Sequence, residues 1–231
     1  FYLWLATNIQ PGIVQEAVDG EASFTDDAFV KAFEQLQMIY DDGILAETNF
    51  GLDAYPGCDE AMKNGNCAAY LTGEWYLGNY LMGTSLEGAP TENDEIGIVT
   101  FQNIEGGQTY MQKYASFGYS ISNECEYKEE AMQVIQELTQ GEAAEAWANY
   151  MACVPAGKDV TIDMDNMKSD EAKGTYQAAL DALNENPSVL RSTLNTELDN
   201  KIGECVVSVM RSGLDVNDAL QQIQDTADSV R

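Results

Sequence analysis

The sequence contains no histidine among its 231 residues. Histidine is the usual general base of nucleophilic triads and the commonest zinc ligand, so its absence excludes Ser-His-Asp and Cys-His catalysis. The five cysteines show no C-x-x-C spacing, which argues against a zinc site or a thioredoxin-type redox motif. We therefore expect neither a metal nor a cofactor.

Basic residues are scarce. The sequence has 11 Lys and Arg but 39 Asp and Glu. The resulting net charge of -28 would repel nucleic acids and anionic lipid headgroups. No nucleic-acid partner is expected. The acidic surface instead suits an exported or cell-surface protein.

Long apolar runs are missing as well. No run is long enough to span a bilayer, and the first residues lack the basic-then-apolar order of a signal peptide. The chain opens with the apolar segment FYLWLA, which is typical of the middle of a domain. We therefore expect a fragment of a longer protein, with any lipoprotein signal in the upstream part.

The cysteines allow two interpretations. Cys58 and Cys67 bracket a short helical segment, and Cys125 and Cys153 bracket two helices that could fold back on each other. Both pairings would suit an exported protein. Alternatively, all five cysteines are small buried apolar residues. Cys205, inside a predicted helix, would remain unpaired in either case.

Helical spacing of apolar residues is the dominant pattern in the chain. It predicts helices between Thr25 and Gly43 and over about 58–64, 127–139, 142–151, 169–184 and 194–212, with a last helix capped by Asp215. Residues 1–9 predict either a core helix or part of a cleft wall. Residues 10–24 predict a loop or a hairpin.

Three segments predict strands, namely CAAYL (67–71), IGIVTF (96–101) and the stretch 110–122. The first ends at Thr72-Gly73, and a helix-like segment led by Trp75 follows at once. Glu74 suits the positive end of that helix dipole. Because open α/β sheets bind ligands at such strand-to-helix corners, Trp75 is a candidate ligand contact.

Four segments in this order resemble a known family. They are DDAFVKAFEQLQMIYDDGIL, MKNGNCAAYLTGEWYLGNY, IGIVTFQNIEGG leading through FGYSISNECEYKEEAMQVIQELT, and VVSVMRSGLDVNDALQQIQ. Together they resemble the extracellular solute-binding proteins of family 1, the carbohydrate-binding components of bacterial ABC importers. Each motif alone is a weak signal, but the four motifs occur in the family's order and together extend over nearly the whole chain.

The resemblance implies a helix-rich α/β protein with the two-lobed, type II periplasmic-binding-protein fold. Residues 1–95 and 160–231 would form a discontinuous second, C-terminal lobe. Residues 96–159 would hold a crossover strand and the returning part of the first, N-terminal lobe. Most of the first lobe would be absent from this chain.

The resemblance also implies a function without catalysis. The chain would be a monomer that binds a small carbohydrate, an oligosaccharide, and delivers it to the permease subunits of an ABC transporter. It would be extracellular, either periplasmic or lipid-anchored at the cell surface of a bacterium.

Sugar binding needs aromatic rings for the apolar pyranose faces and planar polar groups for the hydroxyls. Trp75 matches the family's stacking tryptophan, with a core tryptophan as the alternative. The other candidates are Glu74, Tyr114, Phe117, Tyr119, Asn195, Glu197, Asp199 and Trp4. A helix-start carboxylate would explain Glu74 equally well, and a solvated helix start would explain the three residues at 195–199.

Three alternatives to sugar binding remain open at this stage. A glycoside hydrolase would use paired carboxylates, but with 39 acids some pair always has a suitable separation, so their abundance is no evidence. The same fold class also binds solutes other than sugars. A structural module of the cell surface usually shows internal repeats, and the sequence has none.

Overall fold

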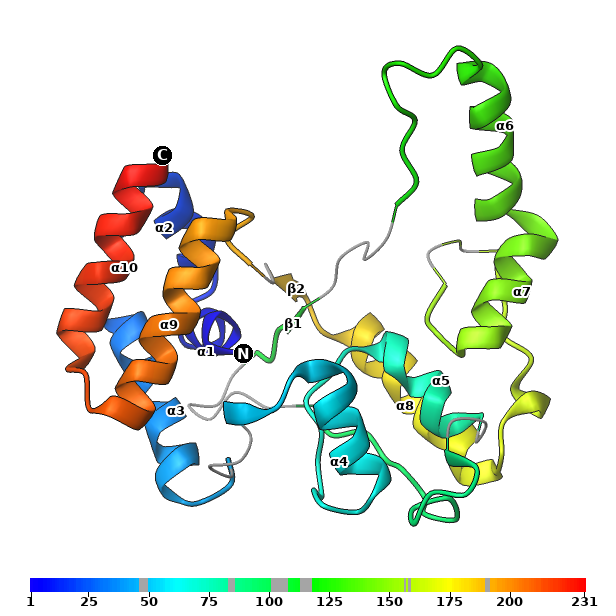
Figure 1. Ribbon diagram of the computed structural model, residues 1–231, viewed down its shortest axis with the longest axis horizontal. Helices are drawn as coiled ribbons and strands as arrows, with labels where there is room; N and C mark the ends of the chain where they lie inside the picture. Colours follow the sequence, from blue (N-terminus) through cyan, green and yellow to red (C-terminus); the bar gives the residue numbers. More distant parts are fainter. Residues whose placement is uncertain are drawn as a thin grey trace. The chain divides into compact units, whose positions relative to one another are not determined.

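A computed structural model describes residues 1–45, 50–82, 86–100, 108–112, 118–155, 157, 159–189 and 192–231. Contacts divide the chain into two compact units (Figure 1). Unit 1 comprises Phe1–Leu52, Thr100–Tyr114 and Leu183–Arg231, and unit 2 comprises Asp53–Val99 and Ala115–Ala182. The lobe boundaries predicted from the sequence lie elsewhere, and the lobe assignment stays a prediction.

Unit 1 is built mainly from helices around one apolar core. Its helices are α1 (Tyr2–Ile9), α2 (Ile13–Asp19), α3 (Asp27–Asp41), α9 (Thr196–Ser212) and α10 (Val216–Val230). Aromatic side chains fill the centre: Phe24, Phe29 and Phe33 are fully buried, and the Tyr2 ring lies 4.4 Å from that of Phe33. The periodic apolar positions of α3, α9 and α10 therefore face inward, as the sequence predicts.

The first 24 residues bear on two predictions, one for residues 1–9 and one for residues 10–24. Residues 2–9 form a buried helix, as one of the two interpretations proposed. The loop or hairpin predicted for 10–24 is wrong, because α2 occupies its middle. Gly12 and Gly20, both with positive φ, bracket this helix, and its buried face is too short to show a period in the sequence.

Polar contacts join the last helix to the first part of the chain. The Oε1 atom of Gln224 accepts hydrogen bonds from the Ser23 hydroxyl (3.0 Å) and from the Phe24 backbone N–H (2.8 Å). The Arg231 guanidinium donates to the carbonyl oxygens of Ala17 and Val18 at the end of α2. A cation at this position also interacts favourably with the negative end of the α2 dipole.

The strands in the described residues are minimal. β1 (Met111–Gln112) pairs in parallel with β2 (Ser188–Val189) inside unit 1. Residues 67–71 and 96–100 make no strand, so the strands predicted there are wrong for the described residues; Phe101 lies outside them. A strand requires a hydrogen-bonded neighbour, and Leu71 is instead 58% exposed.

Unit 2 holds shorter elements around a smaller core. They are a π-helical turn (Ala54–Cys58), α4 (Asp59–Lys63), a 3₁₀ turn (Glu74–Tyr76), α5 (Leu77–Leu81), α6 (Lys128–Thr139), α7 (Gly141–Met151), a second 3₁₀ turn (Met164–Asn166) and most of α8 (Asp170–Glu185). The core consists of Leu81, Ala152, Met167, Ala172 and Tyr176. The helix-rich character expected from the sequence is confirmed.

Helices α6 and α7 run one after the other and do not fold back on each other (Figure 1). Cys125 precedes the first helix and Cys153 follows the second, so up to about 35 Å of helix lies between them at 1.5 Å per residue. A disulfide needs Cα atoms within about 7 Å, and this pairing is therefore incompatible with the structure.

Candidate functional site

The candidate site is the turn that carries Trp75. The chain leaves Gly73 in extended conformation and enters the 3₁₀ turn Glu74–Tyr76, which leads directly into α5. The indole ring of the partly buried Trp75 folds back over the backbone of Gly73. A β-carbon at Gly73 would lie only 1.9 Å from the Cζ3 atom of that ring. Glycine is therefore required for this ring position.

Helix α5 is anchored tightly at this turn. A β-carbon on Gly78 would lie 1.8 Å from the carbonyl oxygen of Met151, the last residue of α7. At its other end, the carbonyl oxygen of Leu81 accepts a hydrogen bond from the Lys168 N–H (2.9 Å). These contacts hold the backbone that presents Glu74 and Trp75.

The Glu74 carboxylate is fixed by the backbone. Its Oε2 atom accepts a hydrogen bond of 2.8 Å from the N–H of Val154. Burial raises the pKa of this carboxyl, and the hydrogen bond from Val154 opposes that shift. Protonation of Glu74 is therefore easier than for a solvated glutamate.

Two further ionisable groups, the Cys153 thiol and the Tyr176 phenol, lie near Glu74. Burial, followed by the charge of Glu74, raises the pKa of the Cys153 thiol. Burial also raises the pKa of Tyr176 to about 12, with smaller contributions from Cys153 and Glu74. The thiol and the phenol therefore remain neutral at physiological pH, and a raised thiol pKa does not suit a nucleophile.

Tyrosines pack beside the turn, and the sequence analysis missed them. The Tyr70 and Tyr76 rings meet edge to face at 5.7 Å, and the Tyr76 and Tyr80 rings lie 5.9 Å apart. The Tyr80 hydroxyl donates to buried Asp59 (3.0 Å), which also pairs with Lys63 at 2.8 Å. Four aromatic residues between positions 70 and 80 were the available signal.

The predicted site residues of unit 1 have structural contacts. Asn195 is the N-cap of α9, where its Oδ1 atom accepts the Leu198 N–H (3.1 Å). Asp199 accepts bonds from both the N–H and the hydroxyl of buried Thr193 (2.9 and 2.8 Å). Glu197 is exposed in the first turn of the same helix.

Trp4 lies in the core of unit 1 and is 7% exposed. Its indole Nε1 donates to the carbonyl oxygen of Tyr110 (2.6 Å), and the Tyr110 N–H donates to Asn8 (3.1 Å). Trp4 therefore connects α1 to the segment that leads into β1. This contact gives the residue a structural role whether or not it also meets a ligand.

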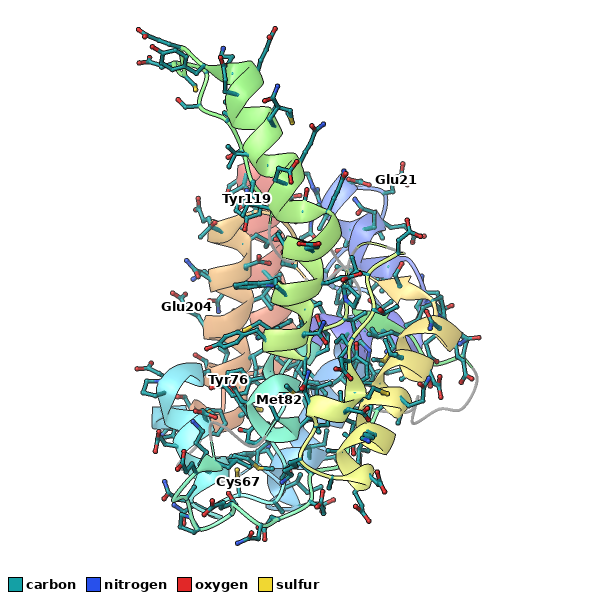
Figure 2. All side chains as sticks on the ribbon, turned by 90° about the vertical axis from the view of Figure 1, so that its right-hand side faces the viewer. Glu21, Cys67, Tyr76, Met82, Tyr119 and Glu204 are labelled. Atoms are coloured by element: carbon teal, nitrogen blue, oxygen red, sulfur yellow. The ribbon has the colours of Figure 1, made fainter. Side chains whose placement is uncertain are left out.

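The remaining candidates come from the stretch around Gly118. Tyr114 and Phe117 lie outside the described residues. Tyr119 is described and 62% exposed. Figure 2 shows it well above Tyr76 within unit 2, so the structure does not bring Tyr119 to the Trp75 turn.

Two depressions in the described surface lie away from these residues. One follows a face of α6 from Glu130 to Leu138, and another lies between α3 and the start of α10. Neither includes a predicted site residue. Among the described residues, no group of three or more acids and cysteines is placed to hold a metal ion. Within the same residues, no helix has the length and apolar character needed to cross a bilayer.

Comparison with known proteins places the chain in a family. The profile of the bacterial extracellular solute-binding proteins matches residues 1–199, and the chain belongs to that family. The match includes Trp75, Glu74 and the start of α9, and it ends before the last quoted segment, VVSVMRSGLDVNDALQQIQ. No curated protein and no solved structure matches the chain significantly.

Family membership confirms the coarse part of the sequence-based assignment. Such proteins bind a small ligand for transport, and they are periplasmic or extracellular and generally not enzymes. A solute-binding role in transport therefore follows for this chain. The kind of solute and the transporter that receives it are not part of the family description.

Proposed function

We propose that the chain binds a small carbohydrate, an oligosaccharide, and delivers it to the permease of an ABC importer without catalysis. The observation that supports this most is the Trp75 ring, which is held against the backbone of Gly73 beside a fixed carboxylate. A rigid aromatic face next to a hydrogen-bond acceptor suits a pyranose, whose apolar face stacks while its hydroxyls donate.

In this proposal each group has a defined task. Trp75 stacks on the sugar ring, and the Oε1 atom of Glu74 accepts a ligand hydroxyl while Oε2 stays bonded to Val154. Tyr70 and Tyr76 extend the aromatic surface. The residues predicted from the sequence at 114, 117, 119 and 195–199, together with Trp4, remain secondary candidates.

The architecture and location belong to the same proposal. The type II two-lobed fold, with residues 1–95 and 160–231 in the second lobe and 96–159 returning to the first, follows from the sequence resemblance. Ligand binding would then favour a closed form, which docks on the permease. The protein would act as a monomer, lipid-anchored or periplasmic.

A thermal-shift screen tests the ligand class. Mono- and oligosaccharides, amino acids and short peptides are added in turn to the purified protein. A ligand at 100 times its Kd raises the free energy of unfolding by about 2.7 kcal/mol. Stabilisation by saccharides alone supports the proposal, whereas stabilisation by amino acids or peptides alone would assign a non-sugar solute.

Two tryptophan variants test the site. Trp75→Ala is expected to weaken saccharide binding by about 2 kcal/mol or more, roughly 30-fold, as for a central aromatic contact. Trp147→Ala is the matched control, because Trp147 is 60% exposed on α7 in the same unit. Equal affinities of both variants would remove Trp75 from the site. Turnover of a chromogenic glycoside would overturn the non-catalytic assignment.

A further inference from the structure

Two cysteines of unit 2 lie at either end of one short helix. Cys58 is the N-cap of α4, and Cys67 follows four residues after the helix ends at Lys63. Both side chains are partly buried. They form the only Cys pair of the sequence that is separated by fewer than ten residues.

The turn after α4 brings the second cysteine back to the helix. The N–H groups of Gly65 and Asn66 donate to the carbonyl oxygens of Met62 (3.0 Å) and Ala61 (2.8 Å). Gly65 has a φ of 70°, which glycine adopts without strain. The chain therefore reverses, and Cys67 runs back beside α4.

A sulfur contact fixes the face on which Cys67 lies. Its Sγ atom is 3.9 Å from the Sδ atom of Met62. Met62 is four residues after Cys58, where helical geometry places two side chains on one face, about 5–6 Å apart at their β-carbons. The spacing therefore places Cys58 and Met62 on one face of α4, and the Cys67 sulfur contacts Met62.

Electrostatics agrees with this placement. The pKa of the Cys67 thiol is raised first by burial and then by the neighbouring Cys58. Such an influence falls off with distance, which agrees with a position of Cys67 beside the helix that begins after Cys58. In Figure 2 Cys67 lies at the lower end of unit 2, below Tyr76 and Met82.

We propose that Cys58 and Cys67 form a disulfide in the exported protein. Each thiol loses a proton and one electron, and a small-molecule or protein disulfide takes up both electrons and both protons to become two thiols. A periplasmic or extracellular location supplies such oxidants. The inference does not depend on which solute the protein binds.

The other three cysteines are unsuitable partners. Cys205 is buried in α9 within the core of unit 1. Cys153 lies beside Glu74 and Tyr176, and Cys125 lies at the far end of the α6–α7 pair. The bond would close the chain immediately before Tyr70 and the Trp75 turn, and so limit the motion of the segment that carries them.

Tryptic mapping tests the bond directly. Lys63 separates the two cysteines, and each of the five cysteines falls on its own tryptic peptide. The protein is exported to a bacterial periplasm, alkylated without reductant and digested. The expected product is peptide 32–63 joined to peptide 64–113, with the other three cysteines alkylated. Five alkylated cysteines, or a link to any other peptide, would overturn the proposal.

Variants supply a second readout. Cys58→Ser with Cys67→Ser should leave the number of alkylated cysteines at three, with or without reductant. Cys125→Ser is the matched control, in which reductant should raise the number from two to four. Reductant is expected to lower the Tm of the parent and of Cys125→Ser, and to leave the double variant unchanged. Equal sensitivity of all three proteins to reductant would count against the bond.

Discussion

Replacing Gly78 by alanine should destabilise unit 2 strongly. The added methyl group would lie 1.8 Å from the carbonyl oxygen and 2.4 Å from the carbonyl carbon of Met151. Both are backbone atoms, so no side-chain rotation relieves the overlap. Helix α5 must move away from the end of α7, and the turn with Glu74 and Trp75 must move with it.

The expected size follows from the contact. Overpacking a close contact costs about 1–3 kcal/mol, and a backbone obstacle favours the upper end of that range. Gly174 in α8 is the matched control, because a β-carbon there meets nothing within 4 Å. Gly174→Ala should stabilise by about 0.5–1 kcal/mol through its better helix propensity. The two substitutions thus differ in sign within one unit.

Thermal denaturation measures both variants, with far-UV circular dichroism as the probe. Tm should fall by about 6–12 °C for Gly78→Ala and rise by about 1–4 °C for Gly174→Ala, for a chain of this size. Saccharide affinity should fall in the first variant and stay unchanged in the second. A Gly78→Ala protein as stable as the parent would refute the packing of α5 on α7.

Substitutions at three further positions, namely Glu74, Asn195 and Phe33, test other parts of the structure. The raised pKa of Glu74 means that the folded state binds its proton more tightly, so its contribution to stability is present in acid and is lost as the pH rises above about 4.5. Glu74→Gln should therefore flatten the fall in Tm between pH 4 and 8. Asn195→Ala should cost about 1 kcal/mol, and Asn195→Asp much less, since either oxygen caps α9; loss of saccharide binding by both would instead indicate a ligand contact. Phe33→Ala should cost about 3–5 kcal/mol in urea denaturation, and a loss below 1 kcal/mol would contradict its full burial.

Helices were predictable because their determinants are local. The apolar spacing around Phe29 and Phe33 predicts α3, and the Asp215 cap predicted for α10 is confirmed by its bonds from the N–H groups of Asn217 and Asp218. The helix predicted to start after Thr25 has its N-cap at Asp26, a difference of the size usual at helix ends.

Strands were not predictable in the same way. An apolar run such as 67–71 has the composition of a buried strand, but whether it becomes one depends on a neighbour that the run itself does not encode. Met111 and Ser188 do pair, although 77 positions separate them. β1 lies within the stretch 110–122 that was predicted as a strand, but no local pattern predicts its pairing with residues 188–189.

For the site, residue types were predictable and their contacts were not. The corner with Glu74 and Trp75 is visible in the sequence, as is its glycine. The ring position over Gly73 and the bond from Val154 depend on how α5 packs. The same limit applies to Asn195 and Asp199, whose polarity suits a ligand and a helix start equally.

The bond between Phe24 and Gln224 has a consequence for how the protein is made. Its partners are 200 positions apart, and the core of unit 1 needs helices from both ends of the chain. During synthesis, the apolar faces of α1 and α3 stay exposed until α9 and α10 have been synthesised and can cover them. Contacts of such long range form slowly and leave time for aggregation. The folding of unit 1 is therefore completed only after α9 and α10 have emerged from the ribosome.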